Sequence, residues 1–410
     1  MAKYQKKTIY FDYASATPID KSVADLVSSY ERKFFANPSS IHSGGVEART
    51  VIEDTRVNIA RLIYAHSYEI IFTASGTESD TLAILGTVRL YKNLPVQAGK
   101  KVPHIITTSI EHPAVLELCK VLEKAGEAEV TYIVPDAQGI INPKDVRDAL
   151  KDNTILVSVM YANNEIGTIQ PIMEIAKVIR HWRKSKNSKF RLLHTDACQA
   201  INYLEIENIE KLGVDLLTFN SSKIYGPKGV GVLYKKRAVV LAPLYVGGGQ
   251  EFGLRSGTEN TSSIAGTSLA LEQTLKMKKK ESARLTKLRD YGIKKLLSLS
   301  KTSGYEIVLN GDRVFRLPNN INISISGISS ELLVIELDAK GILVSAKSAC
   351  KSDEPDESYV INALRKAQGI TSKSTDGSLR ISLGRQTTKS DIDTLVATIA
   401  DILKKYKSLK

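Results

Sequence analysis

Between about residues 50 and 235, short apolar runs rich in β-branched residues alternate with longer amphipathic stretches. The short runs have the length of strands, and the longer stretches have the length of helices. Elements that alternate in this way form a mainly parallel sheet that helices cover on both faces. The expected strands are residues 69–73, 104–108, 129–134, 154–160, 191–195, 215–219 and 229–234, with helices over 77–91, 113–124 and 171–184.

After residue 261 the pattern changes and predicts a smaller α+β domain. A chain of 410 residues has room for two or three domains of roughly 150 residues each, so we expect a boundary near residue 262. The elements expected beyond it are a lysine-rich helix over 264–299, a strand at 319–325, a helix at 330–339, a short strand near Ile342, a strand at 379–383 and a helix at 390–406.

The composition excludes several classes of protein. With 42% hydrophobic and 25% charged residues, the chain is neither fibrous nor disordered. Its three cysteines, Cys119, Cys198 and Cys350, cannot all pair and form no CxxC motif, so we expect no disulfide framework, no metal site and a reducing compartment. No apolar run approaches the ~18 residues of a membrane span, and no signal segment is visible, so we expect a cytoplasmic protein without membrane contact.

The net charge of +13 is compatible with a nucleic-acid partner. However, the lysines are scattered, their densest run (276–280) falls in a predicted helix, and aromatic residues do not interleave with them. We therefore expect a solvated basic surface rather than direct nucleic-acid binding, with an RNA partner as the minor alternative.

Polar groups follow several predicted strands, where parallel α/β sheets bind their ligands. Residues 74–80 place small and hydroxyl side chains at the start of a helix, which suits either a phosphate seat or an ordinary cap on Ser75 or Thr77. They form neither a GxGxxG motif nor a P-loop, so no nucleotide site is indicated. His112 is either a surface histidine or an imidazole that can stack or move a proton. The amides of residues 163–164 suit either a turn or a ligand.

A carboxylate and a lysine complete the set. Asp196 at a buried strand end needs a partner, which a protonated pyridine nitrogen or a helix cap would provide. Lys223 closely follows an apolar strand, and a desolvated lysine can form a Schiff base, although exposed lysines are the default. A phosphate seat, an imidazole, an acid and a lysine, in this order at strand ends, are the groups that pyridoxal phosphate requires.

The sequence resembles the cysteine desulfurases of the NifS/IscS type, in the class-V aminotransferase family of fold type I. The resemblance covers nearly the whole chain. It implies a large pyridoxal-phosphate-binding α/β domain over 16–262 and a small α+β domain formed by 1–15 and 263–410. The motifs that carry it are Tyr10–Pro18, Asn37–His42, Gly76–Asp80, Glu111-His112, Asn163–Gly167, Asp196–Gln199, Lys223–Gly229, Gly247–Glu251, Arg255–Glu259, Ser348–Cys350, Ser358-Tyr359 and Arg380–Arg385.

The resemblance implies a pyridoxal 5′-phosphate cofactor held by Lys223 as a Schiff base. Asp196 would pair with the pyridine nitrogen, His112 would stack on the ring, and Asn164 and Gln199 would hold the ring edge. The residues expected around the phosphate are Gly76, Thr77, Asn220 and Ser222, together with Thr258 from a neighbouring subunit, which implies a homodimer with shared active sites. Asn164 and Arg380 would bind the substrate, Arg380 as a fork on its carboxylate.

Cys350 is expected to take the sulfur of L-cysteine as a persulfide, while L-alanine is released. A free cysteine is usually a small buried residue, but the polar, proline-containing sequence around Cys350 resembles the mobile loop of the housekeeping desulfurases, at about 345–358. Lys347 and Lys351 favour the thiolate, and the acids that follow oppose it. Cys119 and Cys198 are expected to be structural.

The sulfur acceptor stays open between an iron–sulfur scaffold and a tRNA-thiolation enzyme. Ser222 and Val246 stand where the family usually has histidine, Asn220 where serine is common, and Lys347 where glycine is usual. Two alternatives therefore remain: a selenocysteine lyase or another class-V enzyme, and a non-catalytic binding or scaffold protein on the same fold.

Overall fold

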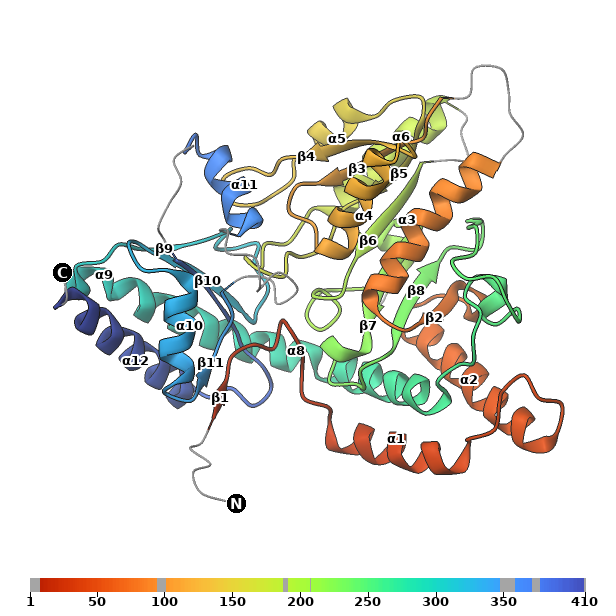
Figure 1. Cartoon of the computed structure of the whole chain (residues 1–410), viewed down its shortest axis with the longest axis horizontal. Helices are drawn as coiled ribbons and strands as arrows, with labels where there is room; N and C mark the ends of the chain where they lie inside the picture. The colour runs from red at the N-terminus through yellow and green to blue at the C-terminus, as the bar shows by residue number, and fades with distance from the viewer. Residues whose placement is uncertain are drawn as a thin grey trace.

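A seven-stranded sheet forms the centre of the molecule in the computed structural model (Figure 1). The structure describes residues 8–93, 101–186, 191–206, 208–346, 358–370 and 377–408. In sheet order the strands are β2 (Ile70–Thr73), β8 (Gly231–Lys235), β7 (Leu216–Asn220), β6 (Leu192–Asp196), β5 (Thr154–Ser158), β3 (His104–Thr108) and β4 (Glu129–Ile133). Only β8 runs antiparallel to its neighbours, so the predicted mainly parallel α/β sheet is confirmed.

Helices cover both faces of this sheet because successive residues of a strand point to opposite sides. Leu156 and Leu216 pack in one apolar cluster with α3 (Gly76–Asn93) and α4 (Pro113–Lys124). Their neighbours Val157 and Leu217 pack in a second cluster. The helices of that second cluster are α2 (Ser43–Leu62), α6 (Ile172–Lys186) and the start of α8 (Thr261–Ser298), and the shorter α5 (Pro143–Ala149) and α7 (Ile209–Leu212) contribute Val146 and Leu212.

A smaller antiparallel sheet, in the order β12-β10-β9, lies at the other end of α8 (Figure 1). Its strands are β12 (Gly377–Ser382), β10 (Asn320–Ile325) and β9 (Ile307–Leu309), and the helices near it are α9 (Ser300–Ser303), α10 (Ser330–Asp338) and α12 (Lys389–Lys407). α11 (Tyr359–Ala367) packs instead with Ile110 and Ile166, from the loops after β3 and β5. The N-terminal β1 (Ile9–Tyr10) pairs in parallel with β11 (Ile342–Leu343), and Phe11 joins the apolar cluster of this region.

The long helix α8 contributes to both regions. Its first turns add Ile264 and Leu271 to the cluster under the large sheet, and its last turns add Ile293 and Leu296 to the cluster of the small sheet. The division into 16–262 on one side and 1–15 with 263–410 on the other stays a prediction, because the first turns of α8, beyond residue 262, pack with the large sheet.

Two helices before β2 were not predicted. α1 (Lys21–Lys33) carries Val23, Leu26, Val27 and Tyr30 at helical spacing, and the buried residues of α2 also follow this spacing. The apolar pattern of both helices was therefore present in the sequence and was overlooked. Among the described helices, none combines the length and the apolar character that a membrane crossing requires.

Candidate active site

A cavity of about 170 Å³ lies at the carboxyl ends of the parallel strands. The N-terminus of α3, the loops after β3 and β5, and the ends of β6 and β7 form most of its wall. Residues from a turn near the N-terminus and from β12 complete it. The predicted site residues that line this cavity are Gly76, Thr77, His112, Asn164, Asp196, Gln199, Asn220, Lys223 and Arg380.

The first turn of α3 forms one end of the cavity. Ser75 Oγ accepts a hydrogen bond from Glu78 N at 3.1 Å, so Ser75 rather than Thr77 caps the helix. A Cβ atom on Gly76 would lie 2.9 Å from Asn220 Nδ2 and 3.0 Å from Cys198 Sγ, so a larger residue does not fit there without movement. Ser75, Gly76 and Thr77 line the cavity, so the N-terminus of α3 faces it, and the helix dipole favours an anion there.

Two carboxyl groups lie on another wall. Asp196 is buried at the end of β6, and its Oδ1 accepts from Cys198 N at 2.8 Å. Asp80, from α3, also lines the cavity, and burial followed by the charge of Asp196 raises its pKa well above the usual range. This burial favours the neutral form of Asp80, and Asp196, at the end of β6, offers its carboxyl group to a cationic group in the cavity.

His112 is the N-cap of α4. Its Nδ1 accepts from Ala114 N at 3.2 Å, which leaves the proton of the neutral ring on Nε2. Burial lowers the pKa of His112, so the imidazole is neutral near neutral pH and can donate from Nε2.

Lys223 lies in a short turn directly after β7. Its Nζ donates to the backbone oxygen of Ala14 at 2.9 Å and to that of Ser15. Gln199 Nε2 donates to the same Ala14 oxygen at 2.9 Å. The turn near the N-terminus thus brings Lys223 and Gln199 to one point of the cavity wall.

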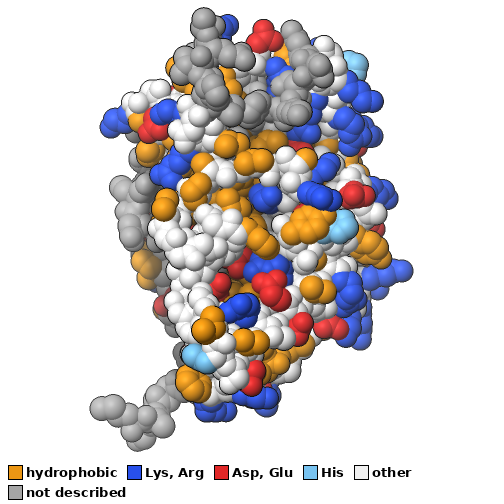
Figure 2. Space-filling model, turned by 90° about the vertical axis from the view of Figure 1, so that its right-hand side faces the viewer, with side chains coloured by type: hydrophobic (Ala, Val, Ile, Leu, Met, Phe, Trp, Pro, Cys, Tyr) orange, Lys and Arg blue, Asp and Glu red, His pale blue; other side chains and the backbone are white. Residues whose placement is uncertain are grey.

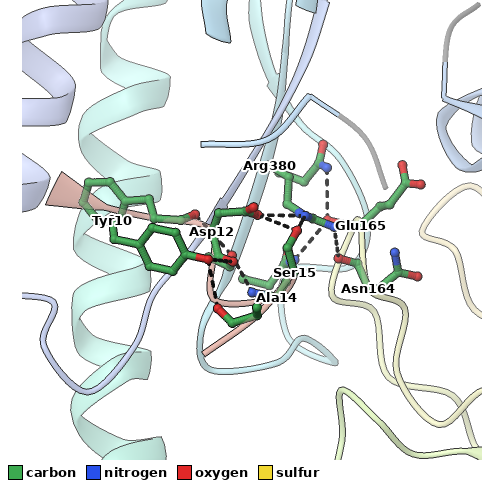
Figure 3. Close-up of polar contacts among 12 residues, drawn as sticks. Tyr10, Asp12, Ala14, Ser15, Asn164, Glu165 and Arg380 are labelled. Atoms are coloured by element: carbon green, nitrogen blue, oxygen red, sulfur yellow. Dashed lines mark hydrogen bonds and ion pairs between the residues drawn. The ribbon is translucent and has the colours of Figure 1, made fainter. Parts of the chain in front are cut away.

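Arg380 is the largest fully buried side chain, with 1% of its surface exposed. Its Nη2 donates to Asp12 Oδ1 at 2.8 Å and to Ser15 Oγ at 2.5 Å, and its Nη1 donates to the backbone oxygen of Asn164 at 3.3 Å (Figure 3). Among the described residues, neither Arg380 Nε nor Asn164 Oδ1 has a hydrogen-bond partner. One donor and one acceptor of this wall are therefore left for a ligand.

Some predicted residues lie away from the cavity. Ser222 does not line it, although its hydroxyl donates to Asn220 Oδ1 at 3.0 Å. Thr258 is exposed in the segment before α8. Cys350, with its neighbours Lys347 and Lys351, lies outside the described residues.

The two described cysteines are buried. Cys119 belongs to the core of α4, whereas Cys198 lines the cavity. Burial raises the pKa of both thiols, so neither is a thiolate near neutral pH. In the part of the chain that the structure describes, no group of histidine, cysteine and acidic side chains could hold a metal ion.

The sequence interpretation missed the contribution of residues 12–15. It noted Tyr10–Pro18 as a motif without giving it a role. Asp12 and Ser15 precede every predicted strand of the large sheet, so strand-end reasoning could not place them beside Arg380.

Comparisons with known proteins show the family and the fold of the chain. Residues 9–395 match the family Aminotransferase class-V. "Cysteine desulfurase IscS" of Dictyoglomus turgidum is 41% identical over 404 residues, which cover 98% of this chain and 96% of that protein. The solved structure of a "NifS-like protein" superposes with a TM-score of 0.85 at 32% identity and covers 97% of this chain and 99% of its own. "SspA in complex with cysteine" gives a TM-score of 0.74 at 33% identity, covering 92% and 99%.

Proposed function

The chain belongs to the class-V aminotransferase family, whose members generally depend on pyridoxal phosphate, and we propose that it acts as a cysteine desulfurase. L-cysteine is converted to L-alanine, and its sulfur is taken up as a persulfide on Cys350 for transfer to an acceptor. One observation carries the proposal: a single cavity gathers an anion-binding helix end, a buried carboxylate, a lysine amine and a buried guanidinium.

The residues present fit pyridoxal phosphate. The N-terminus of α3, with Gly76 and Thr77 on the cavity wall, suits the phosphate, and the buried Asp196 suits a protonated ring nitrogen. The unpartnered Asn164 Oδ1 suits a donor on the ring or substrate, and the amine of Lys223 is within the same cavity. Thr77, Asn220 and Gln199 line the cavity where they could complete these contacts, and Ser222 acts through Asn220.

When bound, pyridoxal phosphate supplies an electron sink for charge that develops at the substrate Cα atom. Lys223 Nζ removes the proton from Cα and later returns a proton to the product. The carbonyl groups of Ala14 and Ser15, which accept from Nζ in this structure, hold the released amine in place. His112, neutral with its proton on Nε2, moves the proton of the substrate thiol.

Arg380 binds the substrate carboxylate. Its unpartnered Nε and its position on β12 at the cavity suit it to orient the amino acid, so that the thiol faces the sulfur acceptor. The Cys350 thiolate attacks the substrate sulfur, an S–S bond forms and the Cβ–S bond breaks. The electron pair of the broken bond stays with the carbon skeleton, which leaves as L-alanine after protonation.

A homodimer with shared active sites belongs to the same proposal. α2 and the segment between β8 and α8 lie on the side of the molecule shown in Figure 2, where hydrophobic side chains are exposed between charged ones. Ile41, Val246 and Phe252, near these elements, are 96%, 91% and 58% exposed. Such exposure favours a protein interface on this side of the molecule. In a homodimer formed through it, Thr258 would lie at the phosphate in the partner's active site.

We further propose that the acceptor of the sulfur is an iron–sulfur scaffold or a tRNA-thiolation enzyme, and that the protein is located in the cytoplasm.

The test is turnover of L-cysteine by the purified protein with pyridoxal phosphate. We expect alanine and sulfide in equal amounts with a reductant, and an absorbance band at about 420 nm from the bound cofactor. Lys223→Ala abolishes both, whereas Lys228→Ala, which removes an exposed lysine nearby, leaves both unchanged. Cys350→Ala keeps the band but loses the persulfide.

Failure of the band to appear would favour a non-catalytic protein on the same fold. A turnover of L-selenocysteine that greatly exceeds that of L-cysteine would favour a selenocysteine lyase. Sulfide release at the wild-type rate from Cys350→Ala would show that this thiol does not take the sulfur.

A further inference from the structure

The turn over residues 12–16 is fixed beside Arg380. Tyr10 Oη donates to the backbone oxygens of Asp12 and Ala16, both at 2.9 Å. Asp12 forms a β-bridge with Ser382 of β12, the strand that carries Arg380. Ser382 N donates to Phe11 O at 2.7 Å. The Asp12 carboxylate is therefore held at the guanidinium by backbone contacts on both sides.

A guanidinium offers a carboxylate two edges for a bidentate ion pair. One edge is formed by Nε with Nη2 and the other by Nη1 with Nη2. This molecule uses both: Arg284 reaches Glu281 through Nε and Nη2, and Arg56 reaches Glu251 through Nη1 and Nη2. Each edge uses one of the two hydrogens of Nη2. A carboxylate can therefore form a bidentate ion pair only where the Nη2 hydrogen of that edge is not already used in another hydrogen bond.

Both hydrogens of Arg380 Nη2 are taken, one by Asp12 Oδ1 at 2.8 Å and one by Ser15 Oγ at 2.5 Å. The Ser15 hydroxyl in turn donates to Asp12 Oδ1 at 2.9 Å, which joins the three groups (Figure 3). Nη1 donates to the backbone oxygen of Asn164, and Nε has no partner among the described residues. Nε is itself buried, so a substrate carboxylate cannot complete a fork on Arg380 until Asp12 or Ser15 leaves Nη2.

We propose that Asp12 is a positioning residue that holds the place of the substrate carboxylate on Arg380 and exchanges with it when the amino acid binds. The proposal rests on the role that the proposed function gives to Arg380. With 2% of its side chain exposed, Arg380 needs a neutralising partner when no substrate is bound. The Asp12 side chain is 20% exposed, so it has solvent to turn into when the substrate arrives.

The exchange affects only ligands that carry a carboxylate. A ligand with a carboxylate displaces Asp12 from Arg380 and neutralises the guanidinium in its place. A simple amine has no carboxylate, so Asp12 stays on Arg380 when the amine binds. Asp12 therefore lowers the affinity for amino acids by the strength of its own bond and has no effect on amines.

Asp12→Asn tests the proposal in the enzyme loaded with pyridoxal phosphate. Asparagine keeps the shape and the acceptor of aspartate but makes the hydrogen bond neutral. We expect the KM for L-cysteine and the dissociation constant of L-alanine, followed by the absorbance of the cofactor, each to fall about fivefold. The dissociation constant of ethylamine, which has no carboxylate, stays unchanged. Asp25→Asn, which removes the same charge from an exposed pair on α1, changes none of these values.

Ser15→Ala is the second variant, because it frees one hydrogen of Nη2 without changing the charge, and we expect a smaller fall in the same constants. Unchanged or raised constants for L-cysteine and L-alanine in Asp12→Asn, or an equal shift for ethylamine, would overturn the exchange. Arg380→Ala separates the proposed role of Arg380 in substrate binding from the proposed exchange with Asp12. If it leaves the KM for L-cysteine unchanged, the role of Arg380 fails and the exchange fails with it. If it raises the KM while Asp12→Asn and Ser15→Ala have no effect, only the exchange fails.

Discussion

The segment between β8 and α8 is held to the large sheet by a buried ion pair, and Glu251→Gln tests how strongly. Arg56 Nη1 and Nη2 donate to Glu251 Oε2 and Oε1 at 2.8 and 2.7 Å, and Phe72 N donates to Oε2 at 2.7 Å. The side chains of Arg56 and Glu251 are only 3% and 1% exposed. Three donors therefore converge on one carboxylate without access to water.

Glutamine has one acceptor oxygen and one amide donor, so it cannot satisfy three donors that point at it. The amide nitrogen of glutamine, which is a donor, would face another donor in either orientation: Arg56 Nη2, or Arg56 Nη1 together with Phe72 N. Breaking a buried pair on one side costs about 3–5 kcal/mol when the remaining charge is uncompensated. Arg56 keeps a second, half-exposed partner, Glu53, at 3.2 Å, so the lower end of this range, about 3 kcal/mol, applies. We expect the free energy of unfolding to fall by that amount, whereas Asp25→Asn, in the exposed pair with Lys21, costs less than about 1 kcal/mol.

The measurement is urea denaturation of the cofactor-free protein, followed by circular dichroism, with the midpoint and slope compared for wild type and both variants. An equal slope with a lower midpoint for Glu251→Gln is the expected result. A loss below about 1 kcal/mol, similar to that of Asp25→Asn, would refute the view that this pair holds the segment in place.

Three further predictions follow from single side chains. Gly76→Ala places a methyl group against Asn220 and Cys198, so we expect the dissociation constant of pyridoxal phosphate, measured by fluorescence titration, to rise at least tenfold; an unchanged constant would place the phosphate elsewhere. Burial raises the pKa of Glu111 to about 8, so the folded state keeps a proton that the unfolded state has lost. The free energy of unfolding of the wild type, relative to that of Glu111→Gln, should therefore fall by up to about 1.4 kcal/mol for each unit that the pH rises between pH 5 and 8. A difference between the two proteins that does not change with pH would contradict this. Burial lowers the pKa of His104 to about 4, so the unfolded state binds a proton first on acidification; wild type should lose stability relative to His104→Asn between pH 6.5 and 4, and parallel curves over that window would argue against it.

The sequence was sufficient to predict the large sheet because its strands are buried on both faces and appear as continuous apolar runs. The strand at 104–108 and the helix at 113–124 were predicted with their observed bounds. α1 and α2 were missed although both carry apolar residues at helical spacing, and both pack against α8, far along the chain. Their position depends on contacts that are distant in sequence.

The candidate site was predictable where it follows the strands. His112, Asp196 and Lys223 lie at the cavity because they come directly after buried strands or at their last residue. Asp12 and Ser15 reach the same place through the pairing of β1 with β11 and the bridge to Ser382. Such pairing over more than three hundred residues leaves no local pattern, so only the structure shows that Arg380 already has a carboxylate partner.

The central claim is that Lys223 carries the cofactor of a cysteine desulfurase. Borohydride reduction of the protein loaded with pyridoxal phosphate, followed by peptide mass mapping, tests it most directly. We predict one phosphopyridoxyl group per chain, on Lys223, and none when L-cysteine has first been added in excess. A label on another lysine, or no label after loading with the cofactor, would contradict the account.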